Sequence, residues 1–398
     1  MSQHASEAIR RPRMDDTDTI VEAALALGPQ IRAAADEIEQ GRRLPLPLVQ
    51  AMKEAGVFRM TMPRAWGGPE ADPLTQLRVI EALSIADGSV GWCAMIGSDS
   101  GYFSAFLDQA VARDMYPDLD AVTGSSLKPA GRALLVAGGY RVSGRWAFGS
   151  GCQHSTWMAS SCIVFEGDTP RMGASGIPEI RVCFLPAADC EIIDTWYTTG
   201  LRGSGSHDFA VKDVFVPAER TFSLLAPPVQ RPDPLYAFPT MFLSNFPGVA
   251  LGIARSAIDA LVTLAGQKPV VMGGGKTLRD EAHLQSAVAY AEALVGSARS
   301  YVFEVLGDLW AALVAGNQPS TGQRARYRLS MTHVHSACVQ AVELVYKVGG
   351  GSSVYATHPF DRHFRDIHTI NQHLAVSLKT YEVAGRMLLG LEPGEPFF

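Results

Sequence analysis

Residues 346–377, near the C-terminus, combine residue types that can approach a ligand closely, bind an anion and move a proton. The triple glycine at 349–351 lets the backbone come near a ligand without side-chain obstruction. A helical pattern begins at Pro359, and a helix start offers free N–H groups to an anion or an electron-rich ring. This pattern carries the side chains Arg362, Arg365, Asp366, His368 and His373.

The spacing of the histidines argues against a metal site. His358, His363, His368 and His373 recur every five residues. Five residues turn a helix by about 500°, so neighbours sit about 140° apart and cannot share a face. Metal-binding pairs on a helix prefer a spacing of four. A lone histidine is usually an ordinary surface or core residue, so we expect most of the ten histidines to be structural.

Two loops rich in glycine and serine offer a second group of candidates. Gly138–Gly151 reads GGYRVSGRWAFGSG, in which a ring could lie against Trp146 and Phe148 while Ser150 offers its hydroxyl or N–H. A hairpin with two core aromatics is the structural alternative. Gly200–Pro217 reads GLRGSGSHDFAVKDVFVP, and small residues there allow a close approach or a sharp turn. The candidate contacts in it are Arg202, Ser204 and Ser206.

Composition excludes several classes of function. The 398 residues carry a formal net charge of −6, which gives no electrostatic basis for binding nucleic acid or an anionic membrane. The long apolar stretch Gly248–Gly266 is interrupted by Arg255 and Asp259, which argues against a membrane span. The N-terminus lacks the features of a secretory signal, and the six cysteines form no CxxC pair. We therefore expect a cytoplasmic protein.

The periodicity along the chain predicts three units after a disordered start at 1–18. The first, 19–120, is helical; the second, 121–235, has short β-branched and aromatic runs that suit a small antiparallel barrel or sandwich; the third, 236–398, is a four-helix bundle. The expected helices of the first unit are 19–41, 46–56, 73–87 and 89–107. Those of the third are 242–266, 283–316, 322–348 and 360–391.

Four motifs together resemble the acyl-CoA dehydrogenase superfamily, and more narrowly its two-component flavin-dependent monooxygenases, such as the oxygenase components of 4-hydroxyphenylacetate and 3-HSA hydroxylases. They are the two loops above, PLPLVQAMKEAGVFRMTMPRAWGGP at 45–69, and GG-x-S-x-Y…P-x-x-R-x-x-RD-x-H from Gly350 to His368. The resemblance implies an α+β, acyl-CoA dehydrogenase-like fold: an N-terminal helical domain, a central β-barrel or sandwich and a C-terminal four-helix bundle. It also implies a homotetramer.

The resemblance further implies a cofactor and a reaction. Reduced FMN or FAD, supplied by a separate flavin reductase, would react with O2 to form a C4a-hydroperoxyflavin that hydroxylates an aromatic or polycyclic small molecule. Ser150 would lie near the flavin N5 and His368 at its reactive edge; His373 also fits the family pattern, with capping or packing as its structural alternative. The expected cofactor contacts are Trp146, Phe148, Ser150, Arg202, Ser204, Ser206, Arg279, Gln285, Gly350, Gly351 and Arg365.

Two other functions are open to a chain of this family. An acyl-CoA dehydrogenase would need a catalytic carboxylate, but the two positions where the resemblance places it are Leu374 and Phe242, neither of which can accept a proton. A catalytically inactive member could act as a binding protein. The chain also departs from related hydroxylases that have a second active-site histidine, since Asp99 and Ser100 occupy that neighbourhood.

Overall fold

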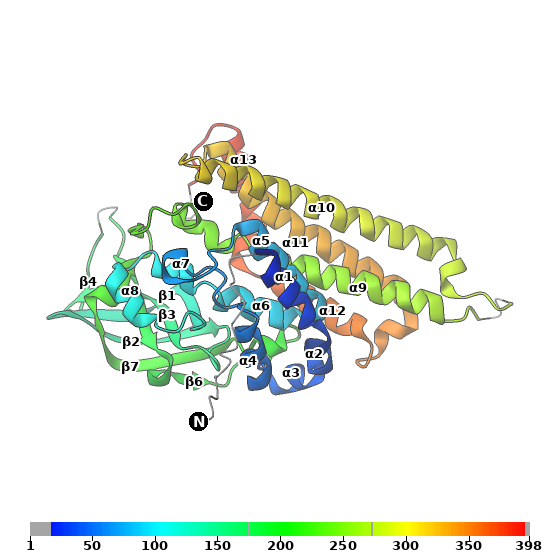
Figure 1. Cartoon of the computed structure of the whole chain (residues 1–398), viewed down its shortest axis with the longest axis horizontal. Helices are drawn as coiled ribbons and strands as arrows, with labels where there is room; N and C mark the ends of the chain where they lie inside the picture. The colour runs from blue at the N-terminus through cyan, green and yellow to red at the C-terminus, as the bar shows by residue number, and fades with distance from the viewer. Residues whose placement is uncertain (1–16, 174–175, 272–273, 395–398) are drawn as a thin grey trace, which may run out of the picture.

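A computed structural model describes residues 17–173, 176–271 and 274–394. The sheet lies at one end of the molecule, three long helices extend toward the other end, and the N-terminal helices pack between them (Figure 1). The segment 1–18, for which disorder is expected, lies outside the described residues except for Thr17 and Asp18, which begin the first helix.

The N-terminal part is helical, as predicted, but it contains more and shorter helices than the sequence pattern indicates. The expected helix over 19–41 is divided into three helices. The second begins with Gly28 and Pro29, and this proline lacks the N–H that a helix continuing from the first would need. Asp72, Asp87 and Asp108 cap later helices with their carboxylates. The helices are α1 Thr17–Ala26, α2 Gly28–Ala33, α3 Ala35–Gly41, α4 Leu46–Glu54, α5 Pro73–Ala86, α6 Gly88–Gly97, α7 Ser100–Ser104 and α8 Gln109–Met115.

The prediction of one helix over 89–107 is wrong. Helix α6 ends at Gly97, and the chain turns at Ser98 and Asp99 before α7 begins. The sequence there is Gly-Ser-Asp-Ser-Gly, and such residues hydrogen-bond to local backbone or favour non-helical conformations. The turn leaves Asp99 buried at the end of the helix that carries Trp92.

The central part is one eight-stranded sheet in the order β6-β7-β2-β1-β3-β5-β8, with β4 paired to β3. The sequence predicts a small antiparallel barrel or sandwich, whereas the described strands form this one sheet, in which every pair is antiparallel except the parallel β1 and β3. The strands are β1 Thr123–Val136, β2 Gly139–Gly149, β3 Trp157–Glu166, β4 Thr169–Pro170, β5 Ile180–Pro186, β6 Glu191–Ile193, β7 His207–Pro217 and β8 Thr221–Ser223.

Trp146 is a core residue of this sheet, so its expected role as a cofactor contact is wrong. The side chain has no exposed surface. Its indole N–H donates to the carbonyl of Ser161 at 2.8 Å, and its ring stacks on Phe209 with centroids 5.3 Å apart. The hairpin alternative, with an aromatic core residue, describes Trp146 correctly. Phe148, two residues later, is 66% exposed.

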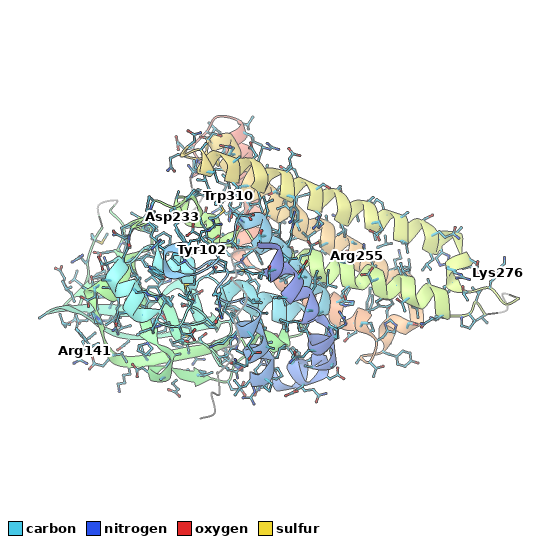
Figure 2. The ribbon with its side chains drawn as sticks, viewed as in Figure 1. Tyr102, Arg141, Asp233, Arg255, Lys276 and Trp310 are labelled. Carbon is cyan, nitrogen blue, oxygen red and sulfur yellow. The ribbon has the colours of Figure 1, made fainter. Side chains whose placement is uncertain are left out.

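The C-terminal part contains the long helices α9 Pro247–Gln267, α10 Ala282–Val314 and α11 Thr321–Gly349. Helix α11 packs against α9 and α10, and α9 packs against α5 of the N-terminal part. Arg141 on β2 and Lys276, between α9 and α10, lie near opposite ends of the molecule (Figure 2). The segment Pro239–Gln267 is long and apolar enough to cross a membrane, but 61% of its most apolar window is buried, as in a core helix.

The expected fourth helix over 360–391 is wrong as a continuous element. Helix α12 ends at Ile370 and α13 begins at Lys379, with a short 3-10 turn at Leu374–Val376 between them. His373 caps this turn, since its side chain accepts a hydrogen bond from the Ala375 N–H at 3.2 Å. The break takes His373 off the helix that carries His368. Helix α12 spans Pro359–Ile370 and α13 spans Lys379–Leu388.

Replacing Trp146 with alanine tests its place in the core. Because the buried ring and its hydrogen bond are both lost, Trp146→Ala should lower the free energy of unfolding by about 3–5 kcal/mol. The exposed Phe148 is the matched control, and Phe148→Ala should change stability by less than about 0.5 kcal/mol. Urea unfolding followed by circular dichroism measures both. Equal effects of the two substitutions would contradict this assignment.

Candidate active site

Three serines from the two glycine-rich loops lie together in a chain of hydrogen bonds. The hydroxyls of Ser150 and Ser206 are 2.7 Å apart, and those of Ser206 and Ser204 are 2.8 Å apart. The Ser204 hydroxyl donates to the carbonyl of Leu201 at 2.7 Å. At the other end, the indole N–H of Trp92 donates to Ser150 Oγ at 2.8 Å. All three serines are almost fully buried.

Backbone geometry holds the two loops against each other. Phe148, the second-last residue of strand β2, has a φ of +64°. Ser204 lies in a short turn between Leu201 and Gly205, whose φ values are +47° and +52°. The Gly151 N–H donates to the Ser204 carbonyl at 3.0 Å. A Cβ on Gly203 would lie 2.1 Å from the Ile38 side chain of α3, so glycine is needed for this approach. The structure therefore brings Ser150, Ser204 and Ser206 together, as the sequence predicts.

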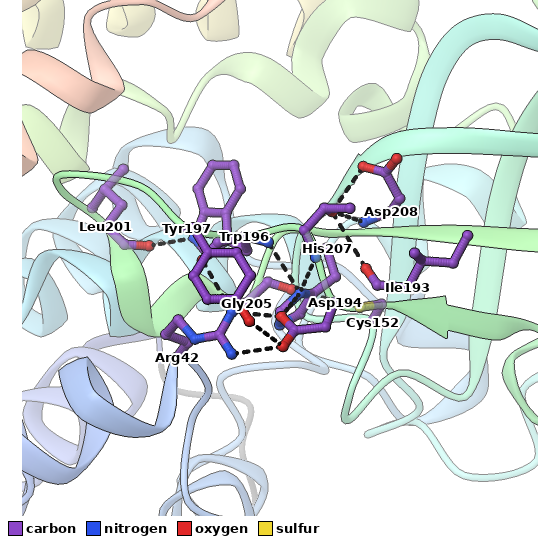
Figure 3. Close-up of polar contacts among 11 residues, drawn as sticks. Arg42, Cys152, Ile193, Asp194, Trp196, Tyr197, Leu201, Gly205, His207 and Asp208 are labelled. Atoms are coloured by element: carbon purple, nitrogen blue, oxygen red, sulfur yellow. Dashed lines mark hydrogen bonds and ion pairs between the residues drawn. The ribbon is translucent and has the colours of Figure 1, made fainter.

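An aromatic and charged cluster adjoins this loop, between β6 and β7 (Figure 3). Arg42 pairs with Asp194 through two contacts of 2.5 and 2.9 Å and stacks over the Tyr197 ring, whose hydroxyl donates to Asp194 at 2.7 Å. The hydrogen bond from Arg42 lowers the pKa of Asp194, with the Tyr197 hydroxyl contributing. The Trp196 indole N–H donates to the Leu201 carbonyl at 3.0 Å, which ties the cluster to the serine loop.

The same region offers groups that suit a flavin. The Phe148 and Tyr197 side chains are 66% and 72% exposed, so aromatic surface is accessible beside the buried serines. The Nε of Arg202 is buried and has no hydrogen-bond partner among the described residues. A flavin presents a flat ring and several acceptor oxygens, which fit an exposed aromatic surface and an unpaired guanidinium N–H. The donor set present here therefore fits such a group.

His373, rather than His368, is the histidine that the contacts connect to the serines. The His373 ring lies 5.5 Å from Trp92 and 5.0 Å from Phe246 between centroids. Trp92 in turn binds Ser150. Part of the His373 side chain is exposed to solvent. The protein packed around the rest of the ring desolvates it and lowers its pKa to about 4, and the positive charge of Arg328 adds to the shift.

The tautomer of His373 follows from its cap. Nδ1 accepts a hydrogen bond from the Ala375 N–H, so in the neutral ring the proton lies on Nε2. That N–H remains available as a hydrogen-bond donor on a ring that packs against Trp92. A neutral donor with a fixed tautomer is one of the arrangements that acid–base chemistry uses.

His368 lies in a different environment. Its Nε2 is 3.3 Å from Glu343 of α11, and its ring packs against Phe364 at 4.4 Å. No contact among the described residues links it to Ser150 or Trp92. Neighbouring Arg365 contacts Glu39 and Asp361, each at 2.8 Å, and donates to the carbonyl of Thr199. The contact with Glu39 of α3 joins α12 to the N-terminal helices.

The other expected cofactor contacts are distant from the serines within one chain. Arg279 and Gln285 are exposed near the turn between α9 and α10, where the Gln285 amide donates to the Arg279 carbonyl at 2.9 Å. Gly350, with a φ of +57°, and Gly351 lie at the end of α11 with open space around them. Lys276, close to Arg279 in sequence, lies at the tip far from the sheet (Figure 2).

Sequence reasoning missed Trp92 and Trp196, and it preferred His368 to His373. Trp92 belongs to an apolar helix whose sequence reads as core, and its hydrogen bond to Ser150 spans 58 positions. Trp196 precedes the GLRGSGS loop by a few residues, so its proximity was a usable signal. The position of His373 depends on the helix break after Ile370, which periodicity did not indicate.

Comparison with known proteins gives consistent matches over nearly the whole chain. The family "Acyl-CoA dehydrogenase, N-terminal domain" matches residues 21–117, and "Acyl-CoA dehydrogenase, C-terminal domain" matches residues 245–378. Indole-3-acetate monooxygenase of Pseudomonas putida is 31% identical, covering 93% of this chain and 96% of the relative. The flavin-dependent monooxygenase oxygenase subunit HsaA of Rhodococcus jostii is 31% identical, covering 88% and 92%.

A solved structure shows the same similarity in three dimensions. The crystal structure of 3-HSA hydroxylase from Rhodococcus sp. RHA1 superposes with a TM-score of 0.88 at 28% sequence identity. The match covers 96% of this chain and 99% of the hydroxylase. The arrangement of N-terminal helices, central sheet and C-terminal helices is therefore an acyl-CoA dehydrogenase-like fold.

The substitution Ser150→Ala tests how much the Ser150 hydroxyl contributes to the stability of the serine hydrogen-bond chain. In Ser150→Ala the buried indole N–H of Trp92 loses its acceptor, so the free energy of unfolding should fall by about 1–3 kcal/mol. Ser155→Ala is a nearby control, because that hydroxyl is only half-buried and donates to the Gly151 carbonyl. Thermal unfolding and Trp fluorescence report the change. An unaltered stability in Ser150→Ala would mean that Trp92 finds another partner.

Proposed function

This chain belongs to the acyl-CoA dehydrogenase family and, within it, to the flavin-dependent monooxygenases, and we propose that it is the oxygenase component of a two-component system that hydroxylates a small aromatic molecule. The proposal is supported most by the continuous contact from Ser150 through Trp92 to His373. It joins the polar loops beside the exposed aromatic surface to a group that can donate or accept a proton.

The cofactor is a reduced flavin, FMN or FAD, and a separate flavin reductase supplies it. One relative is an oxygenase component named for its dependence on FADH2. When bound, the reduced flavin supplies the electrons that activate O2. On this chain, Phe148, Arg202, Ser150, Ser204 and Ser206 would hold it. Arg279, Gln285, Gly350, Gly351 and Arg365 would contribute from a neighbouring subunit or from the edge of the site.

The residues of this chain have distinct parts in the reaction. The buried Ser150 hydroxyl, with Trp92 and Ser206 as partners, provides a fixed dipole close to the cofactor. Trp92, Phe246 and the apolar helices around them exclude water. The neutral His373 ring holds a proton at Nε2 and would donate a hydrogen bond from it, taking the place that the resemblance suggests for His368.

The proposal also covers the assembly of the protein and its location in the cell. Leu374, Leu378 and Leu389 are 83%, 79% and 80% exposed, and apolar surface of this kind near the C-terminus suits a contact between subunits. A homotetramer is the expected assembly, in the cytoplasm and with no nucleic acid or membrane partner. The acyl-CoA dehydrogenase alternative lacks its catalytic base, because Leu374 and Phe242 cannot accept a proton.

The function is tested with purified protein, reduced FMN or FAD generated by an added flavin reductase, and oxygen. Indole-3-acetate and resorcinol serve as probe substrates, since relatives are named for these compounds. We expect tight binding of reduced flavin and hydroxylated product from at least one aromatic probe, detected by mass spectrometry. The protein alone should not oxidise NADH. Unaided NADH oxidation, or no binding of either reduced flavin, would refute the proposal.

Substituting the two histidines separates their roles. His373→Ala should lower product formation by roughly 10²–10⁴-fold and release hydrogen peroxide in place of product, while reduced flavin still binds. His368→Ala should stay within about tenfold of the wild-type rate, because its contacts are to Glu343 and Phe364. Product and peroxide are quantified in the same reaction. The opposite ranking would return the proton-handling role to His368.

The pKa of His373 also predicts a pH dependence. Because the folded-state pKa is lowered to about 4, the neutral ring should persist from about pH 8 down to about pH 5, and coupling should fall only as the pH approaches 4. The unfolded chain binds a proton near 6.5, so the associated stability is present above that pH and is lost as the pH falls toward 4. His373→Gln should therefore lose less stability than the wild type over this interval.

A further inference from the structure

Three buried polar side chains near Phe246 have atoms without a hydrogen-bond partner among the described residues. Asn245 has no exposed surface, and neither its amide oxygen nor its amide nitrogen is paired. His335 is also fully buried with Nε2 unpaired, and Asp99 is 2% exposed with Oδ1 unpaired. Folded proteins leave few such groups, since each loses its water without gaining a partner.

These groups surround the inner side of the proposed active site. Asn245 directly precedes Phe246, whose ring contacts both His373 and Trp92. The His335 ring of α11 lies 4.4 Å from the Phe246 ring. Asp99 lies in the turn between α6, the helix that carries Trp92, and α7. Burial raises the pKa of Tyr327 of α11, and nearby Asp99 adds to the shift. The three residues come from three separate elements: the turn after α6, the segment just before α9, and α11.

The chemistry of the unpaired atoms is mainly that of acceptors. His335 Nδ1 contacts the Met331 carbonyl at 2.9 Å, so Nδ1 carries the proton and Nε2 is an acceptor. Burial lowers the pKa of His335 to about 4, which keeps the ring neutral. The Asn245 amide oxygen and Asp99 Oδ1 are further acceptors. Burial raises the pKa of Asp99 well above its usual range, which favours the uncharged carboxyl.

We propose that Asn245, His335 and Asp99 form the polar end of the substrate pocket and select an aromatic ring that carries an N–H or O–H donor. The ring would lie against Phe246, and the donor would reach the acceptors behind it. This inference deepens the proposed function and rests on it. Because Asn245 is fully enclosed, neighbouring side chains move aside when the ring enters, which is common for pockets that close around their ligand.

Paired probes that differ only in the donor test this selection. Indole and 1-methylindole have the same ring, but only indole has an N–H. Calorimetric titration, without flavin or oxygen, should show indole binding to the wild type at least about tenfold more tightly, which corresponds to one hydrogen bond of about 1.4 kcal/mol. Phenol and anisole form a second pair. Because the measurement needs no turnover, its failure is distinguishable from failure of the proposed function.

Asn245→Leu separates recognition from steric exclusion, because leucine has nearly the same size but no polar atoms. The preference for indole should shrink to within about twofold, mainly through weaker binding of indole. Asp99→Leu should reduce it in the same direction. Asn317→Leu, an exposed asparagine between α10 and α11, is the control and should keep the full preference.

The melting temperature distinguishes a ligand-binding role of Asn245 from a structural one. Since the Asn245 amide is unpaired, Asn245→Leu should raise the melting temperature of the ligand-free protein. A fall in melting temperature, an unchanged preference for indole in this variant, or no measurable binding of any donor probe would overturn the inference. A crystal structure with ordered water on all three groups and no preference between the probes would overturn it as well.

Discussion

The hydrogen bond from the Leu201 N–H to the Asp366 carboxyl, 2.6 Å long, joins segments that are 165 positions apart. Asp366 lies on α12, and Leu201 begins the turn that carries Ser204. Leu201 has a φ of +47°, a conformation that an ordinary residue adopts only when its surroundings hold it there. This contact therefore helps to fix the position of the serine chain relative to the C-terminal helices.

Close packing and charge support that contact. A Cβ on Gly200 would lie 2.2 Å from the Arg365 carbonyl, so the loop and α12 touch backbone to backbone. Burial raises the pKa of Asp366 to about 7, with the charge of Asp87 adding to the shift. Both carboxyls line a cavity of about 170 Å³ beside Arg362, which pairs with Asp36 and Glu39 of α3. Helices α3 and α12 thus enclose the loop from two sides.

Local sequence signals predicted the glycine-serine loops and most elements, because turns and periodicity depend on neighbouring residues. Non-local geometry accounts for the errors. Trp146 and Phe148 are two positions apart and should share one face of a strand. The register shift between Trp146 and Gly149, with Phe148 at positive φ, instead buries the first and exposes the second. Similarly, the break after Ile370 directs His373 toward Trp92, whereas periodicity alone kept it on a helix with His368.

Contacts between subunits depend on a second copy of the chain, so the cofactor roles that the resemblance gives to Arg279 and Gln285 remain predictions. Arg279 and Gln285 are exposed near the turn between α9 and α10, where the Gln285 amide donates to the Arg279 carbonyl. Within the chain, burial alone does not separate structural from functional polar residues. Asp87 and Asp366 are as buried as Asp99, yet each accepts backbone N–H groups that explain its place. Asp99 Oδ1 and both amide atoms of Asn245 have no such partner among the described residues, so the fold alone does not account for these polar groups as it does for Asp87 and Asp366.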